Sequence, residues 1–245
     1  MSTQPLRCED SGSPLSDALI LLLAQEAARP LARFVARRRG SDTGRVSHWA
    51  LTPDRADEAA KVLVGAFSSH DPLREYLAPD PAERMRLSAM MFQRSIDGGL
   101  SGGRVDAWGD PIVGIAIWLP RPAIADGERP PAAVPSAYEE FGPEVVERAA
   151  RVRAVTNRLR AIARPNRHAY LDEIGVLPEH QRRGIATALL EVGHAWADAQ
   201  SLPCALEADV DANIAFYRGR GYDVMANERV PGSDLVLTAM RRAIE

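Results

Sequence analysis

The chain has 245 residues, of which 46% are hydrophobic and 26% charged, and its 30 basic and 33 acidic residues give a net charge of −3. This composition excludes a disordered or fibrous protein, and the charge balance argues against a nucleic-acid binder. Cys8 and Cys204 are the only cysteines, too few for a disulfide framework or a zinc site. We therefore expect no metal and a reducing, cytoplasmic compartment.

The first 45 residues predict an N-terminal extension, and we place the main domain at 46–245. Residues 1–14 predict a loose tail, and 15–39 predict an amphipathic helix that ends in the basic cluster "ARRRG". The apolar run at 18–24 is shorter than the roughly 20 residues of a membrane span and follows acidic residues, so we expect neither a membrane anchor nor a signal peptide. An arm that binds nucleic acid or a partner is the alternative for this extension.

The main domain alternates helices and strands, which predicts an α/β fold with a mixed sheet. A short strand before Thr52 leads to a helix through Phe67, and a second helix at 81–96 is closed by the glycines of "DGGLSGG". A hairpin then turns at Gly109 and Asp110. The remaining elements are a proline-rich loop at 121–135, a helical region at 136–163, a strand at 168–176, a helix from about 184, a strand at 202–209, a short helix at 213–220, and strands at 221–228 and 235–240.

The stretch "QRRGIAT", residues 181–187, predicts an anion site at the start of a helix. Apolar residues recur every three or four positions after Gly184, which places the start of the helix near that glycine. Such a start exposes unpaired backbone N–H groups and the positive end of the helix dipole. Arg182 and Arg183 add cations there, which is unfavourable unless an anion such as a pyrophosphate binds.

Two separated segments carry a resemblance to a known family. "HAYLDEIGVLPEHQRRGIATALL" and "LEADVDANIAFYRGRGYDV" stand in the order and spacing typical of the GCN5-related N-acetyltransferases (GNAT), and the chain looks most like the puromycin N-acetyltransferase branch. The resemblance covers roughly residues 46–242. It implies a single GNAT-like domain with about six to seven strands flanked by helices, splayed between the strands at 168–176 and 202–209, with acetyl-coenzyme A as the acyl donor.

The resemblance also implies where coenzyme A lies. Its pyrophosphate is expected on the backbone amides of 182–187, and its pantetheine arm is expected to pair like an extra strand with Ile174 and Val176, where a bulge opens the sheet. Gly175 weakens ordinary sheet packing there. The full set of expected cofactor-binding residues is Ile174, Gly175, Val176, Gln181, Arg182, Arg183, Gly184, Ile185, Ala186, Thr187, Asn213, Phe216 and Tyr217.

Three residues are expected to carry the chemistry. Tyr217 matches the general acid of the family, with simple core packing as the alternative. An attacking amine must lose a proton, and Glu173 and Glu207, on what should be adjacent strands, are the candidate bases; an ordered water chain is the alternative. The backbone N–H of Ile174 could stabilise the carbonyl oxygen. His70 and Asp71 could line the acceptor site.

The predicted function is therefore transfer of an acetyl group from acetyl-coenzyme A to a small-molecule amine, by direct attack in a ternary complex. The acceptor could be an antibiotic, which would make the chain a resistance enzyme. The alternatives are a catalytically silent acyl-coenzyme A sensor that binds a partner, and a protein N-acetyltransferase. We expect no nucleic-acid or membrane partner, and a monomer or homodimer.

Overall fold

The computed structural model describes residues 48–122, 134–163 and 167–244, all within the unit Val46–Glu245. The predicted tail at 1–14, the predicted helix at 15–39 and most of the proline-rich loop at 121–135 lie outside the described residues. In the part that is described, no helix is long and apolar enough to cross a bilayer.

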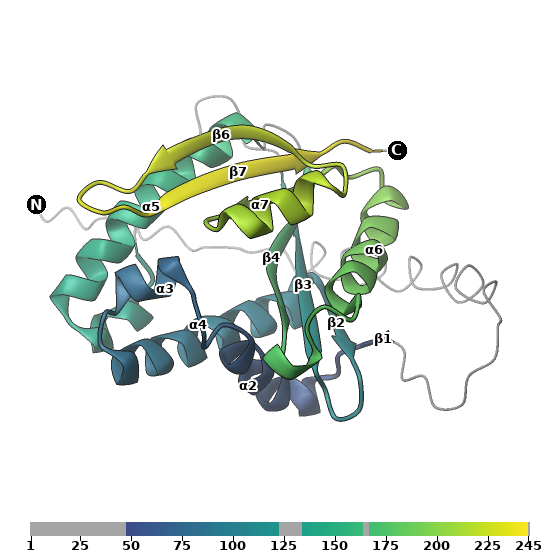
Figure 1. Ribbon diagram of the computed structural model, residues 1–245, viewed down its shortest axis with the longest axis horizontal. Coiled ribbons are helices and arrows are strands. Elements are labelled where there is room, and N and C mark those ends of the chain that lie inside the picture. The colour runs from purple at the N-terminus through teal and green to yellow at the C-terminus, as the bar shows by residue number, and fades with distance from the viewer. Residues whose placement is uncertain (1–47, 123–133, 164–166, 245) are drawn as a thin grey trace, which may run out of the picture. The chain divides into compact units, whose positions relative to one another are not determined.

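One seven-stranded sheet organises the domain, with the strand order β1-β2-β3-β4-β5-β7-β6. Neighbouring strands pair antiparallel except β4 and β5, which pair parallel, so the sheet is mixed as predicted. Figure 1 shows the β6–β7 hairpin running across the direction of β3 and β4. The strands are β1 (His48–Ala50), β2 (Arg104–Trp108), β3 (Gly114–Arg121), β4 (His168–Val176), β5 (Cys204–Ala208), β6 (Asp223–Arg229) and β7 (Val236–Arg242).

Helices cover both faces of this sheet (Figure 1). One face carries α2 and α4, the other carries α6 and α7, and α5 packs against β6 and β7. The helical elements are η3 (Pro53–Arg55), α2 (Ala56–Ala66), α3 (Pro72–Leu77), α4 (Pro81–Gly102), η4 (Ser136–Phe141), α5 (Pro143–Ala163), η5 (Pro178–His180), α6 (Ile185–Asp198) and α7 (Asp211–Arg218).

Close packing on both faces explains two glycines. A Cβ at Gly193 of α6 would lie 2.0 Å from the indole nitrogen of Trp118, a fully buried residue of β3. A Cβ at Gly175 of β4 would lie 2.9 Å from Leu63 and 3.1 Å from Phe67. Because interiors are packed near crystal density, these contacts leave no room for a side chain. Gly175 therefore allows α2 to approach β4, whereas we expected it to weaken the sheet.

The structure extends one predicted helix, divides the predicted helical region at 136–163 into two helices, and adds a helix that was not predicted. The helix expected to end at Ile96 continues as α4 through Gly102, because its glycines pack against the following hairpin: a Cβ at Gly99 would lie 2.5 Å from Val105. The region at 136–163 is two helices, η4 and α5, separated by Gly142 with φ 87°. The short helix α3 was not predicted, although Asp71 accepts from the N–H of Arg74 as its N-cap.

The expected splay in the sheet is present between β4 and β5. These strands pair only at Ala169 with Cys204 and at Tyr170 with Ala205. Beyond that point β4 continues along β3, and β5 continues along β7. A bulge marks the divergence, because Ile117 lies opposite Glu173 while Trp118 lies opposite Leu171, which leaves Asp172 as the extra residue of β4.

Candidate active site

The splay leaves one edge of β4 open. Directly after β4 ends, Leu177 donates its N–H to the carbonyl of Val113, the residue before β3. Because backbone groups alternate sides along a strand, Ile174 and Val176 turn their N–H and C=O groups away from β3, toward the gap. A molecule with amide groups can pair with this edge as a further strand. The backbone of Gly175 faces β3, so its contribution to the gap is steric.

Gln181 reaches back to the open edge from the turn before α6. Its Nε2 donates to the carbonyl of Val176 at 3.0 Å. This bond satisfies an acceptor that a paired strand would otherwise use, so an amide N–H of a bound arm can take the place of the Gln181 amide. The bond also ties the turn at 181–187 to the end of β4.

The turn itself has the backbone geometry of an anion cradle. Arg182 and Gly184 both have positive φ, 60° and 82°, and Gly184 is the N-cap of α6. No atom lies within 4 Å of a Cβ built on Gly184, so its left-handed backbone, and not crowding, favours glycine there. The carbonyl of Gly184 accepts the first helical bond, from Ala188. The N–H groups before Ala188 thus point out of the helix start, next to the exposed Arg182 and Arg183.

A third arginine, which the sequence analysis did not single out, lies at the same turn. Arg220 follows α7 and donates to Oγ1 of Thr187 at 2.5 Å and to the carbonyl of Phe216 at 2.8 Å. Its guanidinium carbon lies 3.6 Å from the centroid of the Phe216 ring. Arg220 therefore fixes the first turn of α6 to the end of α7 and adds a cation to the helix start.

On the other side of β4, Glu173 takes part in a buried ion-pair cluster. Arg74 of α3 is 4% exposed and contacts Asp71 at 2.5 Å and Glu173 at 2.6 Å. Its guanidinium also lies over the rings of Phe67 and Phe92, at 5.1 and 4.1 Å. Because removal of one partner of a buried pair leaves an uncompensated charge, this cluster fixes the position of the Glu173 carboxylate.

Burial dominates the protonation of Glu173. Desolvation raises the pKa of this carboxyl to about 7, and the cation of Arg74 opposes the rise while the charges of Asp172 and Asp71 add to it. A carboxylate with a pKa near neutrality is suited to accept a proton from an attacking amine. A solvated carboxylate with its usual pKa would be a much weaker base.

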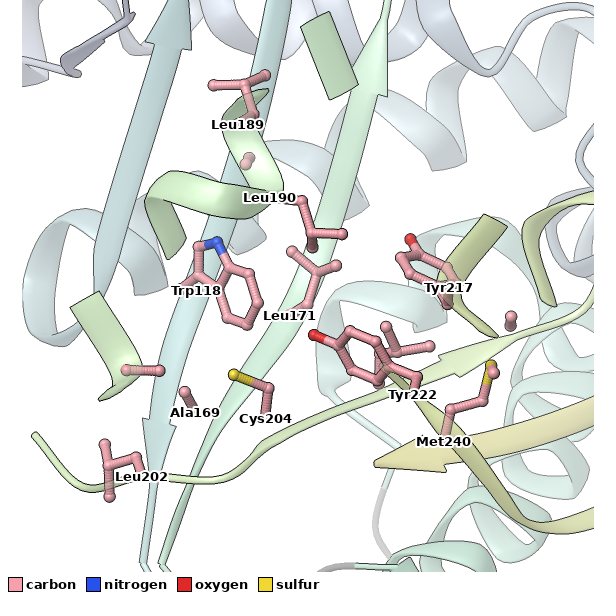
Figure 2. Close-up of a cluster of buried hydrophobic side chains, with 14 of the residues drawn as sticks. Trp118, Ala169, Leu171, Leu189, Leu190, Leu202, Cys204, Tyr217, Tyr222 and Met240 are labelled. Atoms are coloured by element: carbon pink, nitrogen blue, oxygen red, sulfur yellow. The ribbon is translucent and has the colours of Figure 1, made fainter. Parts of the chain in front are cut away.

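Tyr217 lies in the core cluster on the α6 side of the sheet. Its ring packs edge to face on Tyr222, with centroids 5.6 Å apart, and Figure 2 shows the Tyr222 hydroxyl directed toward Trp118 and Cys204. Burial raises the pKa of Tyr217 above its usual value, and the charge of Glu173 raises it further. Tyr217 and Glu173 are therefore close enough at the splay for the charge of one to affect the protonation of the other.

Glu207, the second candidate base, is already engaged. It lies on β5, and its Oε2 accepts from the hydroxyl of Tyr170 at 2.7 Å, with a guanidinium nitrogen of Arg160 at 3.8 Å. Tyr170 lies on β4 at the last β4–β5 pair. Glu207 thus links the two strands where they begin to diverge.

Of the remaining candidates, one is buried in the ion-pair cluster and two are exposed. Asp71 belongs to the Arg74 cluster, whereas His70 is exposed, with its Nδ1 3.5 Å from Glu75. Asn213 is exposed at the start of α7. Besides these candidates, His194 of α6 contacts the hydroxyl of Tyr222 at 3.0 Å, and burial lowers its pKa to about 4, so it is neutral near pH 7.

Sequence reasoning missed Arg74, Arg220 and Asp209. Asp209 follows β5 and accepts from the N–H of Leu73, which holds α3 against the splay; burial raises its pKa. One signal was available: Asp71 and Pro72 form the same cap and first-turn pair that marks other helix starts, and Arg74 follows three residues after the cap. No local pattern marks the bond between Asp209 and Leu73, which are 136 residues apart, or the bond between Arg220 and Thr187, which are 33 residues apart.

Comparisons with known proteins agree with this geometry. Residues 135–222 match the model of the acetyltransferase (GNAT) family. Among solved structures, the chain is similar to a histone acetyltransferase HPA2 and related acetyltransferase from Corynebacterium glutamicum, with 23% identity, a TM-score of 0.53, and coverage of 82% of this chain and 98% of that chain. It is similar to arylalkylamine N-acetyltransferase 2 from Aedes aegypti, with 12% identity, a TM-score of 0.61, and coverage of 82% and 100%.

A third similar structure is the polyamine N-acetyltransferase of Drosophila melanogaster, with 12% identity, a TM-score of 0.58, and coverage of 81% of this chain and 100% of that chain. At these identities the three structures show a shared fold. The family match spans α5, the splayed strands, the turn at 181–187 and α7, which carry most of the candidate site, whereas α3 with Arg74 lies outside the match. Residues 135–222 are therefore similar to the acetyltransferase (GNAT) family, and the domain as a whole has a GNAT-like fold.

Proposed function

We propose that this domain binds acetyl-coenzyme A in the gap between β4 and β5 and transfers the acetyl group to the amine of a small molecule. The observation that carries the proposal is the early end of the β4–β5 ladder at Tyr170 and Ala205. It leaves the backbone of Ile174 and Val176 open, and this edge leads directly into the turn at 181–187. A strand-like arm that ends in phosphates matches both features.

The residues present suit the two ends of coenzyme A. The pantetheine arm carries amides that can pair with Ile174 and Val176, and one of them can replace the Gln181 amide at the Val176 carbonyl. The phosphates meet the N–H groups at the start of α6 together with Arg182, Arg183 and Arg220. When bound, acetyl-coenzyme A supplies an activated thioester.

The chemistry needs a proton acceptor on the amine side and a donor on the sulfur side. Glu173 accepts the proton that the amine loses on attack, because burial brings its pKa to about 7. The N–H of Ile174 is placed to stabilise negative charge on the carbonyl oxygen. Tyr217 donates to the departing sulfur. Its raised pKa keeps the phenol protonated, so a hydrogen bond, and not complete loss of the proton, is its main contribution.

The acceptor is proposed to be a small-molecule amine, and puromycin is one candidate because of the resemblance to the puromycin N-acetyltransferase branch. Two of the similar structures are named for acetylation of arylalkylamines and of polyamines, so both classes of amine are candidate acceptors. The cytoplasmic location, the monomeric or dimeric state and the division at residue 45 stay predictions from the sequence.

The test is release of thiol from acetyl-coenzyme A in the presence of puromycin, 2-phenylethylamine, spermidine and free amino acids. We expect turnover with at least one amine and intersecting initial-rate lines, as direct transfer in a ternary complex requires; parallel lines would indicate a covalent acyl-enzyme instead. Binding of acetyl-coenzyme A without turnover of any amine would favour the sensor. Turnover of peptide N-termini alone would favour the protein N-acetyltransferase.

A further inference from the structure

A cavity of about 440 Å³ lies on the α4 side of the sheet. Arg94 and Ser95 of α4 form one wall, Arg121 at the end of β3 forms another, and Tyr138 of η4 and Asp172 of β4 complete the polar part. The rest is apolar or glycine, including side chains of methionine, leucine and proline. A cavity of this size accommodates a small organic molecule.

The β-bulge places two consecutive carboxylates on this side of the sheet. In a regular strand, Asp172 and Glu173 would point to opposite faces. Here Asp172 is the extra residue, so Glu173 faces Arg74 while Asp172 lines the cavity, and both lie on the side of α3 and α4. The negative charge of Asp172 adds to the rise in the pKa of Glu173, which places the two groups close together.

Tyr138 connects the cavity to the candidate base. Its phenol lines the cavity, and burial raises its pKa; the cations of Arg74 and Arg94 lower it, and the charge of Glu173 raises it. The charges of the cavity wall and of the Arg74–Glu173 pair therefore both act on the phenol of Tyr138. Glu173, the carboxylate that we propose as the base, does not line the cavity itself, but it directly follows Asp172, which does.

Among the residues that the structure describes, the charged groups that line the cavity have no charged partner in an ion pair. Arg94, Arg121 and Asp172 belong to none of the ion pairs among the described residues. Arg121 instead lies over the ring of Tyr170, with its guanidinium carbon 5.6 Å from the centroid. The guanidinium groups of Arg94 and Arg121 and the carboxylate of Asp172 therefore give the cavity wall charges of both signs.

We propose that this cavity holds the amine acceptor and that the acceptor also carries a carboxylate. The proposal rests on the function proposed above. Planar guanidinium groups match carboxylates with paired hydrogen bonds, so Arg94 and Arg121 hold the acid end. Asp172 attracts the ammonium end and Glu173 removes its proton. A diamine or polyamine would place a second cation against the two arginines.

The experiment compares amines that differ only by a carboxylate: 4-aminobutyrate with propylamine, phenylalanine with 2-phenylethylamine, and lysine with cadaverine. Thiol release gives kcat/KM for each, and calorimetry gives acetyl-coenzyme A affinity and the affinity of each acid for the free protein. The variants are Arg94→Gln and, as a control on the same helix outside the cavity, Arg86→Gln.

We expect kcat/KM to be roughly tenfold or more higher for the acid in at least one pair, since a charge-assisted hydrogen bond has about that value. Arg94→Gln should remove this preference by lowering kcat/KM for the acid alone, and Arg86→Gln should keep it. Equal values within every pair, or equal losses for both members in Arg94→Gln, would overturn the proposal.

Failure of the proposed function has a different signature. If acetyl-coenzyme A neither binds nor is consumed, the proposed acetyl transfer is wrong. Binding of the acids alone then tests whether the cavity holds a carboxylate. Wild-type protein should bind at least one acid more tightly than its paired amine, and Arg94→Gln should lose that difference. Binding of none of the three acids by the wild-type protein overturns the proposal.

Discussion

The substitution Glu173→Gln tests whether burial or the ion pair with Arg74 determines the pKa of Glu173. The neutral amide keeps the shape of the side chain but cannot ionise. Burial raises the pKa of Glu173 from 4.5 to about 7, and the side chain is 15% exposed. At ~1.4 kcal/mol per pH unit, ionisation in the folded state costs about 3 kcal/mol more than in the unfolded state.

The sign follows from the raised pKa. The folded protein binds the Glu173 proton more tightly, so this contribution to the free energy of unfolding is complete below about pH 4.5 and is lost as the pH rises to about 7. Wild-type protein should therefore lose about 2.5 kcal/mol relative to Glu173→Gln between about pH 5 and about pH 8. Urea unfolding of both proteins across this range measures the difference.

Glu58→Gln provides a control of opposite sign, because a hydrogen bond from the backbone of Ile112 lowers the pKa of Glu58. Its contribution is present above the usual pKa and is lost as the pH falls. A difference between wild type and Glu173→Gln that does not change with pH, or that grows with pH in favour of wild type, would refute the reasoning. The pair with Arg74 would then outweigh burial, and Glu173 would be a weak base.

Three further predictions concern the cofactor, the proton donor and the extension. Gly184→Val should weaken acetyl-coenzyme A binding in calorimetry far more than Arg183→Ala, because the left-handed turn presents the backbone N–H groups; Gly142→Val, with φ 87° and equally open space, is the matched control and should bind normally. Equal affinity for wild type and folded Gly184→Val would contradict this. Tyr217→Phe should lower kcat roughly 10- to 1,000-fold with little change in acetyl-coenzyme A affinity; a kcat within about twofold, with chemistry rate-limiting, would make Tyr217 a packing residue. A chain that begins at Gly44 should keep binding and turnover, and loss of turnover in a folded truncated chain would show that the extension shapes the acceptor site.

Local patterns predicted the two elements whose backbone we propose as the cofactor site. The strand at 168–176 has the predicted limits, and α6 begins one residue after Gly184, because apolar periodicity and a glycine cap are properties of a short segment. The splay followed only from the family resemblance. Periodicity alone does not reveal that β4 and β5 separate after two residue pairs.

The parts that escaped prediction depend on contacts distant in sequence. Arg74 and Glu173 are 99 residues apart, and Leu73 and Asp209 are 136 apart, so no window of sequence contains either pair. The glycines at the end of α4 resemble a helix stop, yet close packing on the next hairpin keeps them helical. Tertiary contacts overrode local preference at both places.

A crystal structure of the chain with coenzyme A tests the central claim most directly. We predict that the pantetheine amides hydrogen-bond to the backbone of Ile174 and Val176, with the Gln181 side chain displaced from the Val176 carbonyl, and that the pyrophosphate accepts from the N–H groups of 182–187. The sulfur should lie within hydrogen-bond distance of the Tyr217 hydroxyl. Coenzyme A bound outside the gap between β4 and β5, or with its phosphates away from the start of α6, would contradict the account.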